Sequence, residues 1–249
     1  MKYLILLFLC FEAKAFTLLT RNPARYPSEI TIRTSDADCT NAGLTAKGLR
    51  EFVERAVDDY WNSVPTSRAK FKLGPTITIP ASSTTDQMIA LGIEGEIIVG
   101  CSDNATTFTS TSTLAKGGML TNTAVGVVAI NDIANTRFAT VDELSRVSTF
   151  AHELGHAIGI GHSRVEYSLM YYAVVAGVVN KYLTEDDADA ITYLYPSDKE
   201  LAGLGGACGS VDLGNDDDDK KGPGSFVLTL LLGFLITVVA QKSKDLIQP

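Results

Sequence analysis

The residues best suited to chemistry form one short run, H-E-L-G-H-A-I-G-I-G-H at 152–162, which holds all 3 histidines of the 249-residue chain. Histidines spaced four apart lie one helical turn apart on one face, so His152 and His156 can reach the same metal ion. Gly159 can adopt a positive φ, which lets the chain leave the helix and bring back His162 as a third ligand. Three nitrogen ligands leave one position of a zinc ion open, as in catalytic sites.

Glu153 follows the first histidine and projects toward the same region, where its carboxylate can deprotonate a metal-activated water. A bare H-E-x-x-H arises by chance in many helices, but this run adds the glycine and the third histidine. We therefore predict one catalytic Zn²⁺ and hydrolysis with Glu153 as general base. Two alternatives stay open: a zinc-stapled extracellular binding or adhesion module without proteolytic activity, and a non-peptide amidase.

The extended run resembles the motif of the metzincin metallopeptidases, and later stretches are similar to the matrixin branch. Ser163 follows the third histidine, as in matrixins. The run S-L-M-Y at 168–171 resembles the methionine turn below the metal, with Met170 as its supporting residue. L-T-E-D-D-A-D-A-I at 183–191 resembles the closing helix. The resemblance implies a zinc endopeptidase whose protein or peptide substrate lies antiparallel to an edge strand.

The chain departs from matrixins at Tyr172, where they usually carry proline. The resulting S-x-M-x-Y turn resembles that of astacins and serralysins. By that resemblance Tyr172 either ligates the metal and stabilises the oxyanion or forms a wall of the primary specificity pocket. No histidine remains for the second, structural zinc of matrixins, so we expect that ion to be absent. Ca²⁺ is compatible with the family, but no sequence pattern supports it.

The resemblance also implies an α/β fold (α+β, metzincin-like) for the domain. We expect a twisted, mostly parallel five-stranded sheet with an antiparallel edge strand. A long helix and the active-site helix would pack on it, and a short C-terminal subdomain would hold a third helix. The apolar pattern predicts strands at 29–33, 75–80, 96–101, 113–121 (the edge) and 126–131. The Ser/Thr-rich stretch at 106–113 predicts a loop or a weak strand.

The helices have clear sequence signals. Apolar residues at helical spacing from Leu49 to Val64 predict a long amphipathic helix. Thr140 and Glu143 form a capping-box pattern that predicts the start of the active-site helix. Thr184 and Asp187 predict the start of the last helix in the same way. Six apolar side chains should pack the active-site helix on the sheet: Val141, Leu144, Val147, Ala151, Leu154 and Ile158.

Three cysteines would remain after removal of a signal peptide: Cys39, Cys101 and Cys208. The resemblance implies that the first and third strands are parallel neighbours, which would bring Cys39 and Cys101 together. A disulfide between them is therefore expected in an oxidising compartment. Cys208 has no assigned partner.

The composition is that of an ordinary globular chain, with 45% hydrophobic and 20% charged residues. One domain with a substantial core accounts for it, and we expect a monomer. The net charge of −8 argues against nucleic-acid binding, which usually needs a basic face.

The two ends of the chain predict export. The N-terminal residues combine Lys2, an apolar stretch and an A-K-A ending, which is typical of a signal peptide cleaved before Phe16. An apolar segment near the C-terminus predicts a transmembrane anchor or a sorting signal that is later removed; we rank a lipid-anchor signal lower. The protein would be extracellular or held at the cell surface. The expected segments are a signal peptide (1–15), an N-terminal segment (16–28), a metallopeptidase catalytic domain (29–197), an acidic Gly/Asp-rich linker (198–225), a transmembrane or sorting segment (226–241) and a short tail (242–249).

Overall fold

The computed structural model describes residues 16–172 and 180–197, which lie in one compact unit, Met1–Asp212. The expected signal peptide (1–15) and all segments expected beyond position 197 lie outside the described residues. Among the helices that are described, none has both the length and the apolar character needed to cross a membrane.

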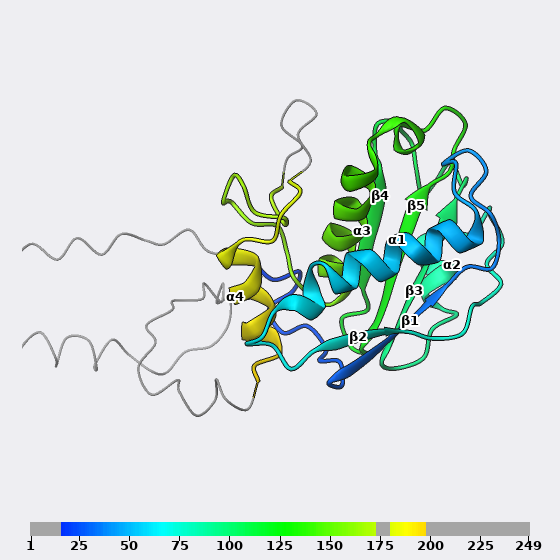
Figure 1. Cartoon of the computed structure of the whole chain (residues 1–249). Helices are drawn as coiled ribbons and strands as arrows, with labels where there is room; N and C mark the ends of the chain where they lie inside the picture. The colour runs from blue at the N-terminus through cyan, green and yellow to red at the C-terminus, as the bar shows by residue number, and fades with distance from the viewer. Residues whose placement is uncertain (1–15, 173–179, 198–249) are drawn as a thin grey trace, which may run out of the picture. The chain divides into compact units, whose positions relative to one another are not determined.

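Five strands form one sheet in the order β2-β1-β3-β5-β4 (Figure 1). The first four in this order run parallel, and β4 pairs antiparallel with β5 at one edge. This confirms the predicted mostly parallel sheet with an antiparallel edge strand. The strands are β1 (Glu29–Thr34), β2 (Lys70–Leu73), β3 (Glu96–Ser102), β4 (Ala115–Met119) and β5 (Val125–Asn131).

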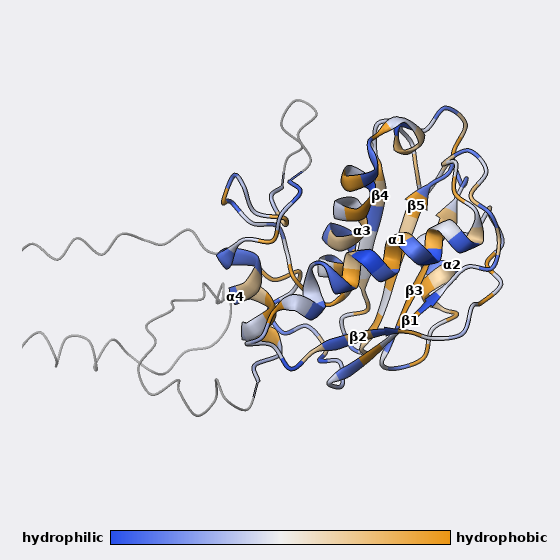
Figure 2. Ribbon diagram, viewed as in Figure 1, coloured by the Kyte–Doolittle hydropathy of each residue, from blue (hydrophilic) through white to orange (hydrophobic). Residues whose placement is uncertain are grey.

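Helices cover both faces of the sheet, because side chains on either side of the central strands are apolar. In β3, Ile97 and Val99 face the large core beneath α1 and α3, whereas Ile98 faces a smaller core that includes Met88 of α2. Figure 2 shows the central strands as largely hydrophobic, whereas hydrophobic and hydrophilic residues alternate along α1. The helices are α1 (Ala46–Asp58), α2 (Thr85–Ile89), α3 (Glu143–Ala157) and α4 (Glu185–Leu194), with 3-10 turns at Trp61–Ser63 and Arg137–Thr140.

The strand predicted at 75–80 was wrong. The neighbour of β1 is instead β2, where Phe71 is buried against the core. Within 75–80 only Ile77 makes a bridge, an isolated one to Ser35. The prolines at both ends of that run lack an amide hydrogen, which explains why it cannot continue the ladder.

The long helix predicted from Leu49 to Val64 was correct in place but too long. Helix α1 ends at Asp58, and Trp61 begins a separate 3-10 turn. The buried indole of Trp61 donates from Nε1 to the carbonyl of Ala151 in α3 at 2.8 Å. This contact ties the end of the α1 region to the helix that carries two of the three histidines.

The start of the active-site helix was placed two residues too early. Asp142, not Thr140, caps α3, since its carboxylate accepts from the amide of Ser145 at 3.0 Å. Lys181 lies 3.2 Å from the same carboxylate. Hydrogen bonds from Ser145, together with Lys181, lower the pKa of Asp142 to about 2.

Leu144 was also wrongly assigned to the core, because α3 begins at Glu143 and turns this side chain to solvent.

Cys39 and Cys101 form a disulfide, with Cα atoms 5.7 Å apart. Cys39 lies between β1 and α1, and Cys101 is near the end of β3, the parallel neighbour of β1. The bond therefore links the segment between β1 and α1 to the C-terminal end of β3, the central strand of the sheet. Cys208 is outside the described residues.

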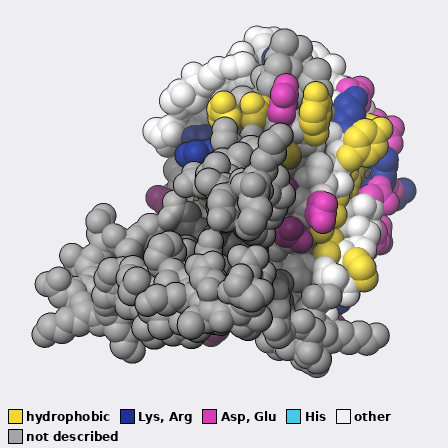
Figure 3. Space-filling model, turned by 90° about the vertical axis from the view of Figure 1, so that its left-hand side faces the viewer, with side chains coloured by type: hydrophobic (Ala, Val, Ile, Leu, Met, Phe, Trp, Pro, Cys, Tyr) yellow, Lys and Arg dark blue, Asp and Glu magenta, His cyan; other side chains and the backbone are white. Residues whose placement is uncertain are grey.

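The surface seen from the α4 side mixes acidic, basic and hydrophobic side chains (Figure 3). Three tyrosines in this part of the chain are well exposed: Tyr167 (75%), Tyr172 (62%) and Tyr182 (72%). Tyr167 precedes the methionine turn, Tyr172 follows it, and Tyr182 precedes α4.

Candidate metal centre

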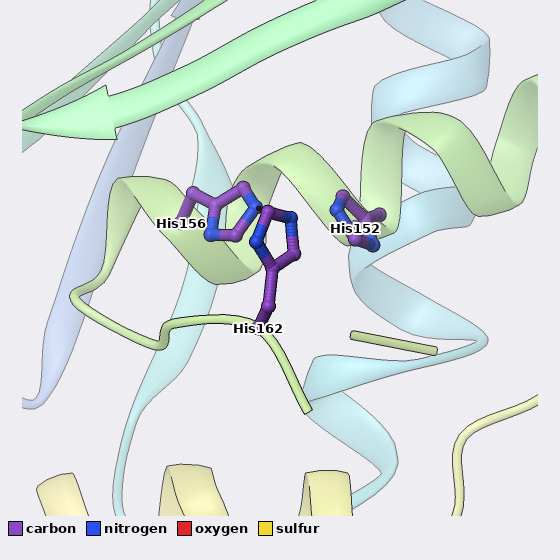
Figure 4. Close-up of side chains that lie close together, drawn as sticks. All are labelled: His152, His156 and His162. Atoms are coloured by element: carbon purple, nitrogen blue, oxygen red, sulfur yellow. Dashed lines mark hydrogen bonds between the residues drawn. The ribbon is translucent and has the colours of Figure 1, made fainter. Parts of the chain in front are cut away.

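Two of the histidines come from the last turns of α3. His152 is half-buried and His156 is buried, and their ring centroids are 4.8 Å apart. Figure 4 shows both rings on the same side of the helix, one turn apart. This is the arrangement predicted from their spacing.

The third histidine arrives on the loop that follows α3. Gly159 has a φ of +100°, a conformation that L side chains rarely adopt, and the chain reverses there. The ring of His162 then lies 4.6 Å from that of His156 and 5.5 Å from that of His152, measured between centroids (Figure 4). One nitrogen from each ring lies within 4.8 Å of the others.

Backbone carbonyls set the tautomers of the two helical histidines. Nδ1 of His152 is 2.7 Å from the carbonyl oxygen of Leu169, and Nδ1 of His156 is 2.8 Å from that of Ile160. A carbonyl can only accept, so each Nδ1 carries the proton and donates. Each Nε2 is therefore left with a free lone pair, as metal ligation requires.

The donor set fits a zinc ion. Nε2 of His156 lies 3.2 Å from Nε2 of His162. Zn–N bonds of about 2.0–2.1 Å at tetrahedral angles put two nitrogen ligands roughly 3.3 Å apart. When both Nε2 atoms are unprotonated, their lone pairs repel at this separation, and a cation between them removes that repulsion. These three residues would hold the ion that the predicted chemistry requires.

The surroundings keep all three imidazoles neutral. Burial lowers the pKa of His152, and it lowers that of His156 to about 3. The pKa of His162 is also lowered, by burial first and then by His152. Neutral rings are the form that binds a metal, so the site is ready for ligation at neutral pH.

Glu153 lies between the helical histidines in sequence and close to the edge strand in space. Burial raises the pKa of its carboxyl to about 7, and the Gly117 amide opposes that rise by hydrogen bonding. Strand and helix come very close here: a β-carbon on Gly117 would lie 2.2 Å from the backbone oxygen of Glu153. A glycine in β4 thus allows the edge strand to reach the predicted general base.

The methionine turn lies under the histidines. Met170 is fully buried, and its Sδ packs against Gly155, between the two helical histidines. The amide of Ser163 donates to the carbonyl of Met170 at 2.7 Å. Tyr172 is exposed, with its ring 4.7 Å from that of Tyr171.

Sequence reasoning missed the contacts that hold the third histidine. Thr17 Oγ1 donates to the carbonyl of His162 at 2.7 Å, and the amide of Gly161 donates back to the carbonyl of Thr17 at 2.8 Å. A further bond joins the amide of Leu19 to the carbonyl of Gly159 at 3.0 Å. No local pattern near Thr17 signals this pairing, because its partners are far away in sequence.

Sequence reasoning also missed half of the role of Asp187. It predicted Asp187 as the partner of Thr184 at the start of α4, and this bond is present, from the Thr184 amide at 2.8 Å. The same carboxylate accepts from the amide of Leu169 in the methionine turn at 2.8 Å. The Thr-x-x-Asp spacing could reveal only the first of these contacts.

Comparison with known proteins agrees with this geometry. Residues 85–196 match the family model for matrixin. Over 56 residues, 22% of this chain, the sequence is 43% identical to Metalloendoproteinase 2-MMP and 41% identical to Metalloendoproteinase 5-MMP, both from Arabidopsis thaliana. The chain spans only 15% of the length of each of these relatives. Together with the sheet order and the three clustered histidines, the match over residues 85–196 supports a matrixin-like metzincin domain in this chain.

Proposed function

We propose that the protein is a zinc-dependent endopeptidase. The observation that carries this proposal is the convergence of three imidazoles, two of them from α3, the helix that also carries Glu153 directly after His152. Zinc, when bound, would act as a Lewis acid on water and on the scissile carbonyl. His152, His156 and His162 would hold it, and Met170 would support them from below without taking part in proton transfer.

Glu153 would carry the proton through the reaction. Its carboxylate takes a proton from the attacking water and then passes it to the departing amine nitrogen, so the carboxylate is regenerated. In the metal-free chain burial raises the pKa of Glu153 to about 7, and a bound dication would lower it and favour the carboxylate form that accepts the proton. No nucleophilic side chain is required.

The substrate would bind along β4. Within the described sheet this strand pairs only with β5, so its outer edge can accept an extended peptide. An antiparallel peptide would be held by main-chain hydrogen bonds, with its scissile bond above α3. Gly117, which approaches Glu153, lies on this strand and would align the substrate with the base.

The decisive experiment is Glu153→Gln. The variant should keep its zinc and lose cleavage of a denatured protein by a factor of about 10³ or more, since the base is removed and the ligands remain. Glu54→Gln, on the exposed side of α1, is the matched control and should retain activity. If zinc-loaded wild-type protein cleaves no member of a peptide library, the zinc-stapled binding module becomes the better account.

Tyr172 has two candidate roles in this proposal. As a metal ligand and oxyanion stabiliser it would affect turnover, whereas as a pocket wall it would affect substrate choice. Its side chain is exposed and contacts only the neighbouring ring of Tyr171 among the described aromatic residues. Tyr172→Phe should lower kcat in the first case and change the cleavage profile in the second.

We also propose that the protein is exported and held at a surface. The support is the sequence of residues 1–15 and 226–241, together with the Cys39–Cys101 disulfide, which suits an oxidising compartment. N-terminal sequencing of protein from the producing cells should give Phe16 as the first residue. Recovery with the membrane fraction, compared with the medium, tests the anchor.

A further inference from the structure

Asp187 is a buried carboxylate that the proposed reaction does not use. It lies in the first turn of α4 and has no exposed surface. In the part of the chain that the structure describes, no lysine or arginine forms a salt bridge with it, so its charge is stabilised by hydrogen bonds. The donors are the hydroxyl of Ser168 (2.5 Å), the amides of Leu169 (2.8 Å) and Met170 (3.0 Å), and the amide (2.8 Å) and hydroxyl (2.7 Å) of Thr184.

These donors come from two places in the chain. Thr184 precedes α4, and its bonds to Asp187 close the start of that helix. The other donors belong to the methionine turn, at 168–170. The carboxylate therefore joins the beginning of α4 to the loop under the metal centre, and a helix cap alone does not explain its position.

One peptide group connects Asp187 to a histidine ligand. The amide of Met170 and the carbonyl of Leu169 belong to the same planar peptide unit, where N–H and C=O point in opposite directions. The N–H end donates to Asp187 at 3.0 Å, and the C=O end accepts from Nδ1 of His152 at 2.7 Å. Because the unit is rigid, fixing one end fixes the direction of the other, and the two bonds polarise each other.

We propose that Asp187 is a positioning residue for the metal centre, acting on His152 through the Leu169–Met170 peptide. The carboxylate sets the direction of the Leu169 carbonyl. That carbonyl holds the proton on Nδ1 of His152 and turns Nε2 toward the metal. Carboxylates that bond directly to a ligating histidine have the same effect; here one peptide group is inserted between them.

His156 provides an internal reference for this proposal. Its Nδ1 bonds to the carbonyl of Ile160, and within the part of the chain that the structure describes no hydrogen bond joins Ile160 to Asp187. A change at Asp187 should therefore disturb the ring of His152 and leave the ring of His156 in place. A general loss of structure would disturb both.

The test is Asp187→Asn in the full-length chain. The side-chain amide of asparagine has an NH₂ group in place of one carboxylate oxygen. That NH₂ group would face the N–H and O–H donors of the methionine turn, so the hydrogen bonds that hold the turn would be lost. Zinc affinity, measured by competition with a chelator, should fall by about 10–100-fold. In NMR spectra, the Nδ1–H signal of His152 should shift or be lost to solvent exchange, while that of His156 remains.

Asp189→Asn is the matched control, because it removes the same charge from an exposed position of α4. It should leave zinc affinity and both signals as in the wild type. Asp187→Glu keeps the carboxylate and should restore part of the affinity lost in Asp187→Asn. Unchanged affinity and an unchanged His152 signal in folded Asp187→Asn would overturn the proposal.

Ser168→Ala decides the matter if Asp187→Asn does not fold. This change removes one donor to the carboxylate and also the Oγ atom that accepts from the Met170 amide at 3.1 Å. It should weaken zinc binding by about 2–10-fold, the scale of single hydrogen bonds, with a shift only at His152. If neither quantity changes, Asp187 is a structural clamp alone. This role of Asp187 rests on the proposed function, because both require the metal site. A wild-type protein that binds no zinc would refute the proposed function. Equal zinc binding by the wild type and the variant would refute only the role of Asp187.

Discussion

The helix and the loop hold their histidines in different ways. On α3, the rings of His152 and His156 are fixed by carbonyl acceptors at 2.7 and 2.8 Å. On the loop, the ring of His162 is exposed, and among the described residues no carbonyl acceptor holds it. What is fixed there is the backbone, through Thr17, which lies 145 positions away in sequence.

The two helical histidines are therefore positioned before metal binds, whereas His162 completes the site when metal binds. The helical pair is positioned by packing and by short-range contacts, so it should have its ligating geometry before metal arrives. The loop histidine depends on the docking of residues 16–19 and can adjust its ring when metal binds. The site thus combines a rigid half with an adaptable half.

Replacing the histidines should have the largest effect. His156→Gln and His162→Gln should each weaken zinc binding by more than about 100-fold, since even outer partners of ligands contribute 10–100-fold. Without metal, His156→Gln should lower the free energy of unfolding by about 1–3 kcal/mol because a buried hydrogen bond is lost. His162→Gln should change it by less than about 0.5 kcal/mol. Chelator competition and urea unfolding measure the two quantities, and equal stability losses would contradict the comparison.

Gly117→Ala tests the rigid half next. Its β-carbon would lie 2.2 Å from the backbone oxygen of Glu153, so β4 or α3 must shift. We expect a loss of about 1–3 kcal/mol in stability and a fall in kcat/KM on the order of 100-fold, since the base is displaced. Gly118→Ala is the control, because a β-carbon there has no neighbour within 4 Å among the described atoms. Equal behaviour of the two variants would show that the close contact is unimportant.

Titration of His156 should make the metal-free protein less stable as the pH falls below about 6.5, whereas Glu153, whose pKa is raised from 4.5 to about 7 in the folded chain, opposes this loss above about pH 4.5. An unfolded histidine binds a proton near that pH, whereas His156 in the folded chain does so only at about 3. Between these values the unfolded state binds more protons, and the free energy of unfolding falls by up to about 1.4 kcal/mol per pH unit for this group. His156→Gln should flatten the slope more than His162→Gln. Unfolding curves at several pH values, with chelator present, give the slopes.

Thr17→Val should have the smallest effect and acts on the adaptable half. Loss of the hydroxyl removes one partly exposed hydrogen bond to the His162 carbonyl, worth about 0.5–1.5 kcal/mol. Zinc affinity should fall a few-fold without a change in the Nδ1–H signals of the helical histidines. Thr123→Val, at an exposed position, is the control. A shift in the His152 signal would show that the two halves are coupled.

The difference between the helical histidines and the loop histidine also explains what the sequence could predict. The H-E-x-x-H spacing determines which side chains share a helix face, so His152 and His156 could be placed from sequence alone. Most strands carried a clear apolar pattern and were found, but β2 was missed because K-F-K-L has a single buried residue, Phe71. Helix α2 was also missed, although Thr84 and Gln87 form a capping box. Contacts such as Thr17 to His162 depend on tertiary docking and leave no periodic signal.

The sheet order has a consequence for where this domain can be cut. The region that matches the matrixin model, 85–196, excludes β1 and β2, the two strands on the outer side of β3. A polypeptide limited to that region would present β3 with a row of unpaired amides and carbonyls flanked by bare apolar surface. Such an edge recruits strands from other molecules, so the truncated chain should aggregate rather than fold as a smaller domain.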